Sequence, residues 1–369
     1  MTLLQGEEEK DMHIPERMQA AVLEQPNQLV IRKVATPTPG PQEVLIRVES
    51  CAICSSDVSL IGKPWAFQPA YGKFIPGHEY AGTIVATGET VDELRPGDRV
   101  AVEAHLGCLR CRNCRLGNYT ACLNYGNLDK GHRANGFTTN GGYAQFVVNH
   151  VNTVYKIPES IDFNEASLIT NLGCVLYGFE TIGGYVVGDQ VVVIGPGPLG
   201  LISVAVAKAL CADKVLLIGT RDDRLNMGKA LGADRTININ TEDPMEVIHN
   251  EMGKFGADLV IESSGSASGP EMAIEATKPM GKILLLGFPD RPVKADFALL
   301  GKNNKTIYTV RGEGRANVGR AISMLANGKI SLKPLATHTF PLGEIQEAFN
   351  AFTERIDGAV KVVVKPNAV

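Results

Sequence analysis

The sequence predicts a two-domain α/β protein, in which an all-β domain precedes a domain built on a parallel sheet. Three observations predict this class. The chain has 369 residues, which favours two domains at about 150 residues each. Its first part, from Met18 to about Val148, consists of short β-rich segments broken by Gly and Pro. After about Ser160, continuous apolar strands alternate with helical patterns, as in parallel sheets.

In the first part, residues 20–34 predict a hairpin with Pro26 and Asn27 in its turn. Further strands are predicted at 43–53, 80–88, 98–104 and 143–148. Strands of this length, separated by turn signals such as Pro96-Gly97-Asp98, are typical of a small closed barrel.

The second part begins with a helical pattern over 163–183. Its strands are predicted at 190–195, 214–219, 257–265 and 281–287, and its helices at 197–212 and 224–233. Strands this apolar are buried on both faces, which indicates helices on both sides of the sheet. Beyond about residue 303 the pattern is mixed, with helices at 321–330 and 345–354 and a last strand at 359–366.

Composition and charge exclude several classes of protein. Hydrophobic residues make up 44% and charged residues 21%, which excludes a disordered chain and a coiled coil. The formal charge of −4 gives no electrostatic footprint for nucleic acid. No stretch reaches the 18 or so apolar residues of a membrane span. Residues 1–17 form a polar extension without an apolar signal region, so we expect a cytoplasmic protein with reduced cysteines.

A glycine-rich turn predicts a dinucleotide site. Gly195, Gly197 and Gly200 form G-x-G-x-x-G between a buried strand and a helix, with Pro198 and Leu199 completing the turn. The glycines allow a tight turn, a close approach to a pyrophosphate and close helix packing. The helix N-terminus then attracts the anion. The alternative is an ordinary glycine-rich connection.

The end of the next strand distinguishes the two nicotinamide cofactors. An acid there binds the ribose of NAD, whereas an arginine accommodates the 2′-phosphate of NADP. The sequence reads Gly219, Thr220 and Arg221, which favours NADP. Asp222 and Asp223 follow and weaken this preference, and Arg224 suits either cofactor. Arg221 is alternatively an ordinary solvated loop arginine.

Four of the eight cysteines lie close together: Cys108, Cys111, Cys114 and Cys122. Four thiolates on a short loop can close a tetrahedral structural zinc site. An iron–sulfur cluster is the rival, but its motif ends in C-x3-C-P, whereas here seven residues precede Cys122 and Leu123 follows it.

Two further segments carry metal-binding residue types. Cys54 begins Cys-Ser-Ser-Asp, which ends at Asp57, and Gly77-His78-Glu79 follows later. Cys, His and Glu are competent zinc ligands, and a site with three of them can hold water or substrate. We interpret Cys51 and Cys211 as small hydrophobic residues.

These motifs together resemble the zinc-containing medium-chain dehydrogenases, the superfamily of alcohol, sorbitol and threonine dehydrogenases. The resemblance rests on CAICSSD, PGHEYAGTIVATG, RPGDRVAVEA, the four cysteines, NGGYAQFVV and IGPGPLGL, in that order. It implies a GroES-like catalytic domain over 18–165 with a zinc lobe at 105–125. A Rossmann domain over 166–303 interrupts it, and the chain returns to the first domain over 304–369.

The resemblance also implies roles for single residues. Cys54, His78 and Glu79 are expected to hold a catalytic zinc completed by water, and Asp57 to orient the histidine. Ser56 is expected to contact the substrate oxygen and pass its proton outward. The four-cysteine lobe is expected to hold a second, structural zinc. The implied reaction is reversible hydride transfer between an alcohol and NAD(P), in a homodimer or homotetramer.

Two positions depart from the family pattern. Ser59 stands where a histidine often ends the proton relay. Thr170 and Asn171 stand where many polyol-type members have Glu-Pro, with the Glu at zinc. Cys174 then falls beside the expected nicotinamide, or reaches the zinc if the helix is shifted. A reductase of carbonyls or activated double bonds, with a weakened or absent catalytic zinc, is therefore the alternative function.

The segment 61–76 lies between the two ligand motifs and is expected to face the substrate. Trp65, Phe67 and Tyr71 make it aromatic, and Lys63 and Lys73 could attract an anionic group. Alternatively, it is a surface loop that packs its own aromatic residues. Polyols, sugar alcohols, β-hydroxy amino acids and plain secondary alcohols remain open as substrates.

Overall fold

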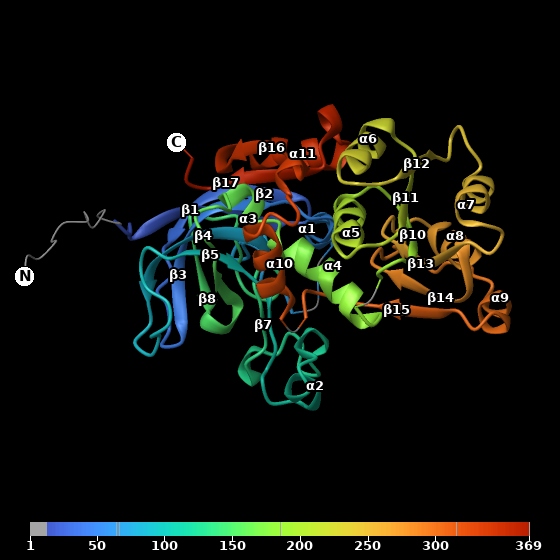
Figure 1. Cartoon of the computed structure of the whole chain (residues 1–369). Coiled ribbons are helices and arrows are strands. Elements are labelled where there is room, and N and C mark those ends of the chain that lie inside the picture. Colours follow the sequence, from blue (N-terminus) through green and yellow to red (C-terminus); the bar gives the residue numbers. More distant parts are fainter. Residues whose placement is uncertain (1–12, 64, 66, 185, 315, 369) are drawn as a thin grey trace, which may run out of the picture.

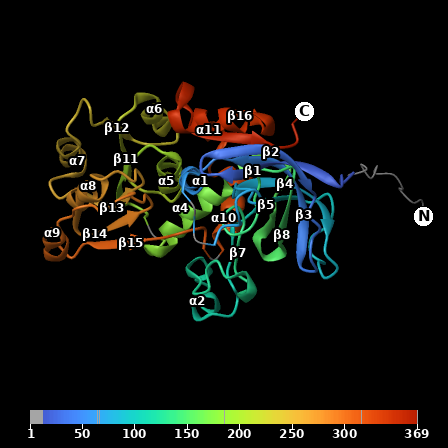
Figure 2. The same ribbon diagram turned by 180° about the vertical axis from the view of Figure 1, so that it is seen from behind.

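The computed structural model describes residues 13–63, 65, 67–184, 186–314 and 316–368. Residues 1–12 of the expected polar extension, and Pro64 and Ala66 of the segment 61–76, lie outside the described residues. Two bodies lie side by side, a barrel-like β domain and a sheet flanked by helices, with α4 (Ile169–Thr181) and α10 (Asn317–Ala326) between them (Figures 1 and 2). The predicted two-domain α/β class is confirmed.

The barrel domain is built on a seven-stranded sheet. Six strands run in the order β16-β17-β3-β4-β5-β9, and β8 pairs with β3. Their bounds are β3 (Glu43–Ala52), β4 (Glu79–Thr87), β5 (Arg99–Val102), β8 (Phe146–His150), β9 (Val154–Lys156), β16 (Ala336–Pro341) and β17 (Lys361–Lys365). The last two come from the C-terminal part of the chain, and β17 pairs antiparallel with β3 at Cys51 and Ala52.

Smaller elements complete this domain. The predicted hairpin forms from β1 (Arg17–Gln25) and β2 (Gln28–Ala35), and its turn residue Asn27 adopts a positive φ of 61°. Helices α1 (Ser55–Gly62), α3 (Phe163–Ala166) and α11 (Ile345–Glu354) pack around the strands. A lobe projects from the barrel at the strand pair β6 (His105–Leu106) and β7 (Arg133–Ala134) and carries α2 (Arg112–Arg115).

The second domain contains a six-stranded parallel sheet in the order β12-β11-β10-β13-β14-β15. This is the doubly wound order 3-2-1-4-5-6 of dinucleotide-binding domains. The strands are β10 (Gln190–Ile194), β11 (Lys214–Gly219), β12 (Arg235–Asn238), β13 (Ala257–Glu262), β14 (Thr277–Leu285) and β15 (Thr306–Thr309). The helices are α5 (Pro198–Ala209), α6 (Asp222–Ala230), α7 (Pro244–Met252), α8 (Gly269–Ala276) and α9 (Phe297–Lys302).

One apolar core joins the two bodies. It includes Ala81 of β4 and Ala101 of β5 on the barrel side, Leu172 of α4 between the bodies, and Val193 of β10 in the parallel sheet. All four residues are fully buried. Burial of apolar surface is the main favourable term in folding, so this shared core stabilises the contact between the two bodies. The contact lies next to the start of β4 and the start of α1.

Candidate active site

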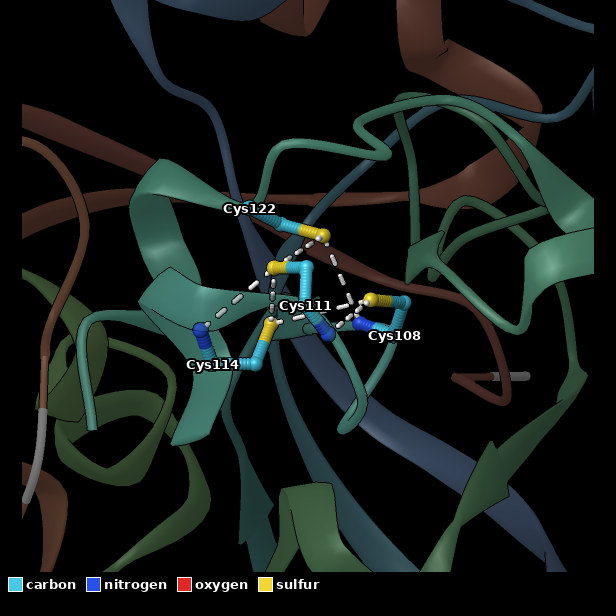
Figure 3. Close-up of side chains that lie close together, drawn as sticks. All are labelled: Cys108, Cys111, Cys114 and Cys122. Carbon is cyan, nitrogen blue, oxygen red and sulfur yellow. Dashed lines mark hydrogen bonds between the residues drawn. The ribbon is translucent and has the colours of Figure 1, made fainter. Parts of the chain in front are cut away.

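The four cysteines of the lobe converge as their spacing predicts (Figure 3). Their sulfur atoms lie within 4.8 Å of one another, with Sγ–Sγ distances of 3.9 Å for Cys108–Cys114, 3.4 Å for Cys111–Cys114 and 4.0 Å for Cys111–Cys122. Four sulfurs about 2.3 Å from a tetrahedral zinc lie about 3.8 Å apart. The donor set therefore fits a closed zinc site.

Hydrogen bonds lower the pKa of two of these thiols, Cys108 and Cys111, whereas burial raises the pKa of Cys114 and Cys122. Asn124 donates from its side-chain Nδ2 to Cys108 Sγ at 3.1 Å and from its backbone N to Cys122 Sγ at 3.3 Å. The backbone N–H of Cys111 donates to Cys108 Sγ at 3.3 Å. Burial opposes ionisation of Cys108, but these bonds outweigh it and lower the pKa of its thiol to about 6. A thiol that ionises this readily is prepared to bind a metal.

A second group of donors lies where β4 meets α1. Cys54 is the N-cap of α1, while His78 immediately precedes β4 and Glu79 begins it. The ligand atoms of these three residues lie within 4.8 Å of one another. His78 and Glu79 are buried, and Cys54 is partly exposed. A thiolate, an imidazole and a carboxylate suit zinc and leave a fourth position for water or substrate.

Asp57 fixes the orientation of His78. Its Oδ1 lies 3.0 Å from His78 Nδ1, and its Oδ2 accepts hydrogen bonds from Cys54 N at 2.9 Å and Tyr143 Oη at 2.8 Å. Since a carboxylate only accepts, Nδ1 carries the proton and Nε2 is left for a metal. Burial alone would lower the pKa of His78, but the charge of Asp57 and its hydrogen bond raise that pKa well above the usual value.

Ser56 lies beside two of the candidate ligand atoms. Its Oγ is 3.1 Å from Cys54 Sγ and 3.2 Å from His78 Nε2. Ser59, one turn later on α1, donates instead to the backbone oxygen of Ser55 at 3.3 Å. Ser56 is therefore the hydroxyl of this helix turn that faces the donor group.

Both carboxylate oxygens of Glu79 already have partners. Oε2 forms a buried ion pair with Lys361 of β17, and Oε1 accepts from Asn171 Nδ2 at 2.7 Å. Lys361 also donates to the backbone oxygen of Ile53 at 3.1 Å. Burial would lower the pKa of Lys361, yet the charge of Glu79 raises it. Glu79 can still offer Oε1, which lies 4.0 Å from His78 Nε2.

Thr170 and Cys174 lie near this group without joining it. Thr170 is buried, and its hydroxyl has no hydrogen-bond partner among the described residues. Cys174 is not among the donors that converge within the described chain. Burial, followed by the charges of Glu313, Glu79 and Cys54, raises the pKa of the Cys174 thiol well above its usual value.

The glycine-rich turn has the geometry that a pyrophosphate requires. Gly195 follows β10 with a φ of +97°. A Cβ on Gly200 would lie 1.9 Å from the backbone oxygen of Gly195, whereas a Cβ on Gly197 would meet nothing within 4 Å. Gly197 is also the N-cap of α5, with Pro198 in its first turn. The space beside Gly197 thus fits an anion at a helix N-terminus, with Leu199 in the same turn.

An arginine follows the end of β11, where the ribose of a dinucleotide lies in domains of this fold. Arg221 is the N-cap of α6, and Thr220 accepts from Asn240 through its backbone oxygen. Arg224 is buried and donates to the backbone oxygens of Ala359 and Pro196. Arg224 thus joins the turn to the C-terminal segment, and Arg221 is the more accessible arginine.

Residues of the segment 61–76 lie in two different places. The Trp65 ring lies 5.8 Å from the ring of Phe137, which in turn lies 4.4 Å from His78. Lys73 instead lines a separate cavity of about 270 Å³ between the hairpin and the barrel. Phe67 is 59% exposed, whereas Trp65 contacts a ring that itself contacts His78.

Sequence reasoning gave no role to three residues that contact the site: Tyr143, which donates to Asp57, and Asn171 and Lys361, which hold Glu79. Lys361 had a usable signal, because a lysine inside the apolar strand Lys361–Lys365 needs a buried partner. The others come from segments distant in sequence. Among the helices that the structure describes, none is long and apolar enough to cross a membrane.

The fold and the site together define an oxidoreductase with a dinucleotide-binding domain and zinc-binding donor groups. Residues 40–159 match the alcohol dehydrogenase GroES-like domain, and residues 198–327 match the zinc-binding dehydrogenase family. The L-threonine 3-dehydrogenase of Pyrococcus abyssi is 33% identical over 337 residues, covering 90% of this chain and 94% of the relative. That of Deinococcus deserti is 31% identical over 326 residues, covering 88% and 92%.

Solved structures agree with these relatives. A protein described as a zinc-binding dehydrogenase from Sinorhizobium meliloti, bound to NADP, superposes with a TM-score of 0.87 at 26% identity, covering 95% of this chain and 100% of the other. An alcohol dehydrogenase from Escherichia coli complexed with NADH gives 0.85 at 28% identity, covering 95% and 100%. The chain belongs to the zinc-containing medium-chain dehydrogenase/reductase family.

Proposed function

We propose that this chain catalyses reversible hydride transfer between a secondary alcohol or polyol-type substrate and NAD(P), with Cys54, His78 and Glu79 holding a catalytic zinc. The observation that carries the proposal is the convergence of these three donor atoms within 4.8 Å. The hydrogen bond between His78 and Asp57 strengthens it, since such carboxylate–histidine pairs orient metal ligands.

When bound, zinc supplies Lewis-acid polarisation of the substrate oxygen, and the nicotinamide accepts or donates the hydride. The chain's own residues bind, orient and move the proton. Ser56 Oγ lies 3.2 Å from His78 Nε2, so its hydroxyl is placed to accept the proton of the substrate alcohol. Because Ser59 bonds to its own helix backbone, the proton leaves Ser56 through water.

Cys108, Cys111, Cys114 and Cys122 hold a second, structural zinc in this proposal, which gives two zinc ions per chain. Their four sulfurs leave no coordination position for a substrate. The lobe therefore contributes to the fold, and the chemistry belongs to the Cys54 site.

The cofactor that we propose is NADP in preference to NAD. Arg221 at the N-cap of α6 is partly exposed, and Asp222 is engaged by Asn238 at 2.7 Å. Arg221→Ala is expected to raise the KM for NADP about tenfold or more and to leave that for NAD nearly unchanged. The exposed Lys229→Ala on the same helix is the matched control.

The runner-up function is a medium-chain reductase with a weakened or absent catalytic zinc. The observation in its favour is that Lys361 and Asn171 occupy both oxygens of Glu79, while Thr170 supplies no carboxylate.

Size-exclusion chromatography with light scattering would test the homodimer or homotetramer that we infer from the family.

Zinc analysis decides between these functions. The purified protein is expected to contain about two zinc ions per chain, and Cys54→Ser about one, with alcohol oxidation lost. Cys211→Ser, which changes an exposed cysteine that belongs to neither donor group, is the control and should keep both zinc ions. One zinc in the wild type, unchanged by Cys54→Ser, would contradict the proposal and favour the zinc-independent reductase.

A further inference from the structure

A cavity that the proposed function does not use lies between the hairpin of β1 and β2 and the barrel. Its volume is about 270 Å³, whereas a cavity of roughly 150 Å³ already holds a benzene molecule. By this comparison it has room for about ten non-hydrogen atoms. Protein interiors contain few voids larger than a water molecule, so a cavity of this size is unusual unless a ligand fills it.

The buried part of the cavity wall is mainly apolar. The two buried polar residues of the wall, Asn135 and Thr153, already donate to backbone oxygens. The large buried apolar side chains of the wall are Met18, Val22, Ile75, Leu106, Phe146 and Val147. This surface suits a hydrocarbon chain.

Backbone hydrogen bonds hold the wall together. Leu23 N of β1 donates to Phe74 O at 2.8 Å, and Gly72 N donates to Leu23 O at 2.9 Å. These bonds join the hairpin to the segment that contains Lys73 and Ile75. The cavity is therefore formed before a ligand binds, as most small-molecule sites are.

Two cations line the accessible part of the cavity. Lys73 is exposed and Arg133 is partly exposed, and neither forms an ion pair with another described residue. Within the described chain, Arg133 reaches backbone oxygens of Leu128 and His132 at 3.5 and 3.4 Å, which is long for a hydrogen bond. Since both cations lack a counter-charge, they favour an anionic ligand group.

The remaining polar groups of the wall are compatible with an anion. Glu43 is the acid among the described lining residues, and its Oε2 accepts from Gly40 N at 2.8 Å. His150 accepts from Asn152 N through Nδ1 at 3.2 Å, so its neutral ring donates through Nε2. The hydroxyl of Thr139 is buried and has no partner in the described structure. Two cations and two neutral donors thus outnumber one acid.

We propose that this cavity binds a monocarboxylate with a hydrocarbon chain of about eight carbons, with its carboxylate at Lys73 and Arg133 and its chain against the apolar wall. Octanoate, which has about ten non-hydrogen atoms, is the probe. The inference goes beyond the proposed function, because none of the lining residues belongs to either group of candidate zinc ligands.

The cavity lies behind the segment that carries His78. Ile75 lines the cavity, and the next two residues are held by the chain on the other side: Pro76 O accepts from Tyr143 N at 3.1 Å, and Gly77 O accepts from Gly142 N at 2.8 Å. His78 follows directly. Because His78 itself does not line the cavity, octanoate should bind there without displacing a ligand of the proposed zinc site.

Calorimetric titration of the purified protein with octanoate tests the proposal. Octanoate is ionised at neutral pH and is expected to bind once per chain, more tightly than octanol or octylammonium. The double variant Lys73→Gln/Arg133→Gln should bind octanoate roughly tenfold more weakly and should lose the preference for octanoate over octanol. Lys63→Gln is the matched control, since Lys63 is exposed in the same segment and does not line the cavity.

Two further variants locate the ligand. Val34→Trp changes a half-buried residue of β2 that lines the cavity, so the larger ring should fill the cavity and abolish binding. A carboxylate could also bind a zinc ion with an open coordination position. Cys54→Ser, which removes a candidate ligand of that zinc, should bind octanoate as tightly as the wild type does. Melting temperatures check that each variant folds.

The contrary outcomes are specific. Octanol that binds as tightly as octanoate, or equal octanoate affinity in Lys63→Gln and the double variant, would overturn the assignment of an anion. No binding to the wild type, binding that survives Val34→Trp, or binding that is lost in Cys54→Ser would overturn the cavity as the site. Because Cys54→Ser is expected to lack alcohol oxidation, its titration tests the cavity independently of the dehydrogenase function.

Discussion

At the scale of single residues, the least expected contact is the ion pair between Lys361 and Glu79. Both side chains are 2% exposed. A buried pair is weak support for stability in itself, but removal of one partner leaves an uncompensated charge. Lys361 and Asn171 together fix the position of the Glu79 carboxylate, which is also a candidate zinc ligand.

This contact gives a direct prediction. Lys361→Met should lower the free energy of unfolding by about 3–5 kcal/mol, because the Glu79 carboxylate loses its cation. Lys365→Met on the same strand is the control and should cost less, since the partners of Lys365 among the described residues are the neutral side chains of Ser50 and Asn164. Chemical denaturation of both variants measures the difference. An equal decrease in the free energy of unfolding of both variants would mean that the ion pair contributes no more to stability than the neutral hydrogen bonds of Lys365.

At the scale of elements, two glycines of the turn between β10 and α5 are required for different reasons. Gly200 is required by packing, because a Cβ at this position would lie 1.9 Å from the backbone oxygen of Gly195. A Cβ at Gly197 would meet no protein atom within 4 Å, so a side chain there would obstruct a bound ligand and not the fold. The two positions therefore predict different failures.

Gly200→Ala should destabilise the protein, and Gly197→Ala should fold normally but bind the nicotinamide cofactor at least tenfold more weakly. Gly197 has a φ of −78°, which alanine adopts without strain. Thermal unfolding and calorimetric titration with NADP and NAD measure the two effects. A Gly197→Ala protein with unchanged affinity for both cofactors would show that no pyrophosphate approaches this turn.

The elements also show how far sequence reasoning reached. The hairpin, the four strands β10, β11, β13 and β14 of the parallel sheet and the two metal-binding motifs were predicted, because each depends on local periodicity or spacing, whereas the edge strand β15 and the short strand β12 were not predicted. Helix α7 was missed although Asp243 caps it and Pro244 begins it, since its apolar face is short. The His105–Glu313 and Lys361–Glu79 pairs were missed because they join segments more than 200 residues apart, and no local pattern encodes such a contact.

At the scale of the whole molecule, the apolar core that joins the two bodies predicts that they unfold together. Leu172→Ala on α4, at a fully buried position of this core, should lower the free energy of unfolding by about 2–5 kcal/mol. It should shift the unfolding transitions of the two bodies by the same amount. The chain has one tryptophan, Trp65 on the barrel side, so its fluorescence follows that body. Far-ultraviolet circular dichroism follows the helices, which lie mainly in the other.

Coincident fluorescence and dichroism curves in the wild type, shifted together in the variant, are the expected result. Leu231→Ala is the control: this partly buried residue, at the C-cap of α6, packs at the edge of the same core and should cost less. Curves that separate would mean that the bodies unfold independently and that α4 does not couple them.

The late position of Lys361 also has a consequence for how the protein is made. Glu79 emerges from the ribosome 282 residues before its cation, a delay of roughly 15–55 s at 5–20 residues per second. Throughout that interval the carboxylate has no lysine to pair with, and β3 lacks the neighbour that β17 provides. The nascent barrel can collapse around its own strands, but the proposed catalytic site is completed only after translation has almost finished. A cell that halts synthesis early therefore releases a chain that carries every candidate zinc ligand and lacks the lysine that positions one of them.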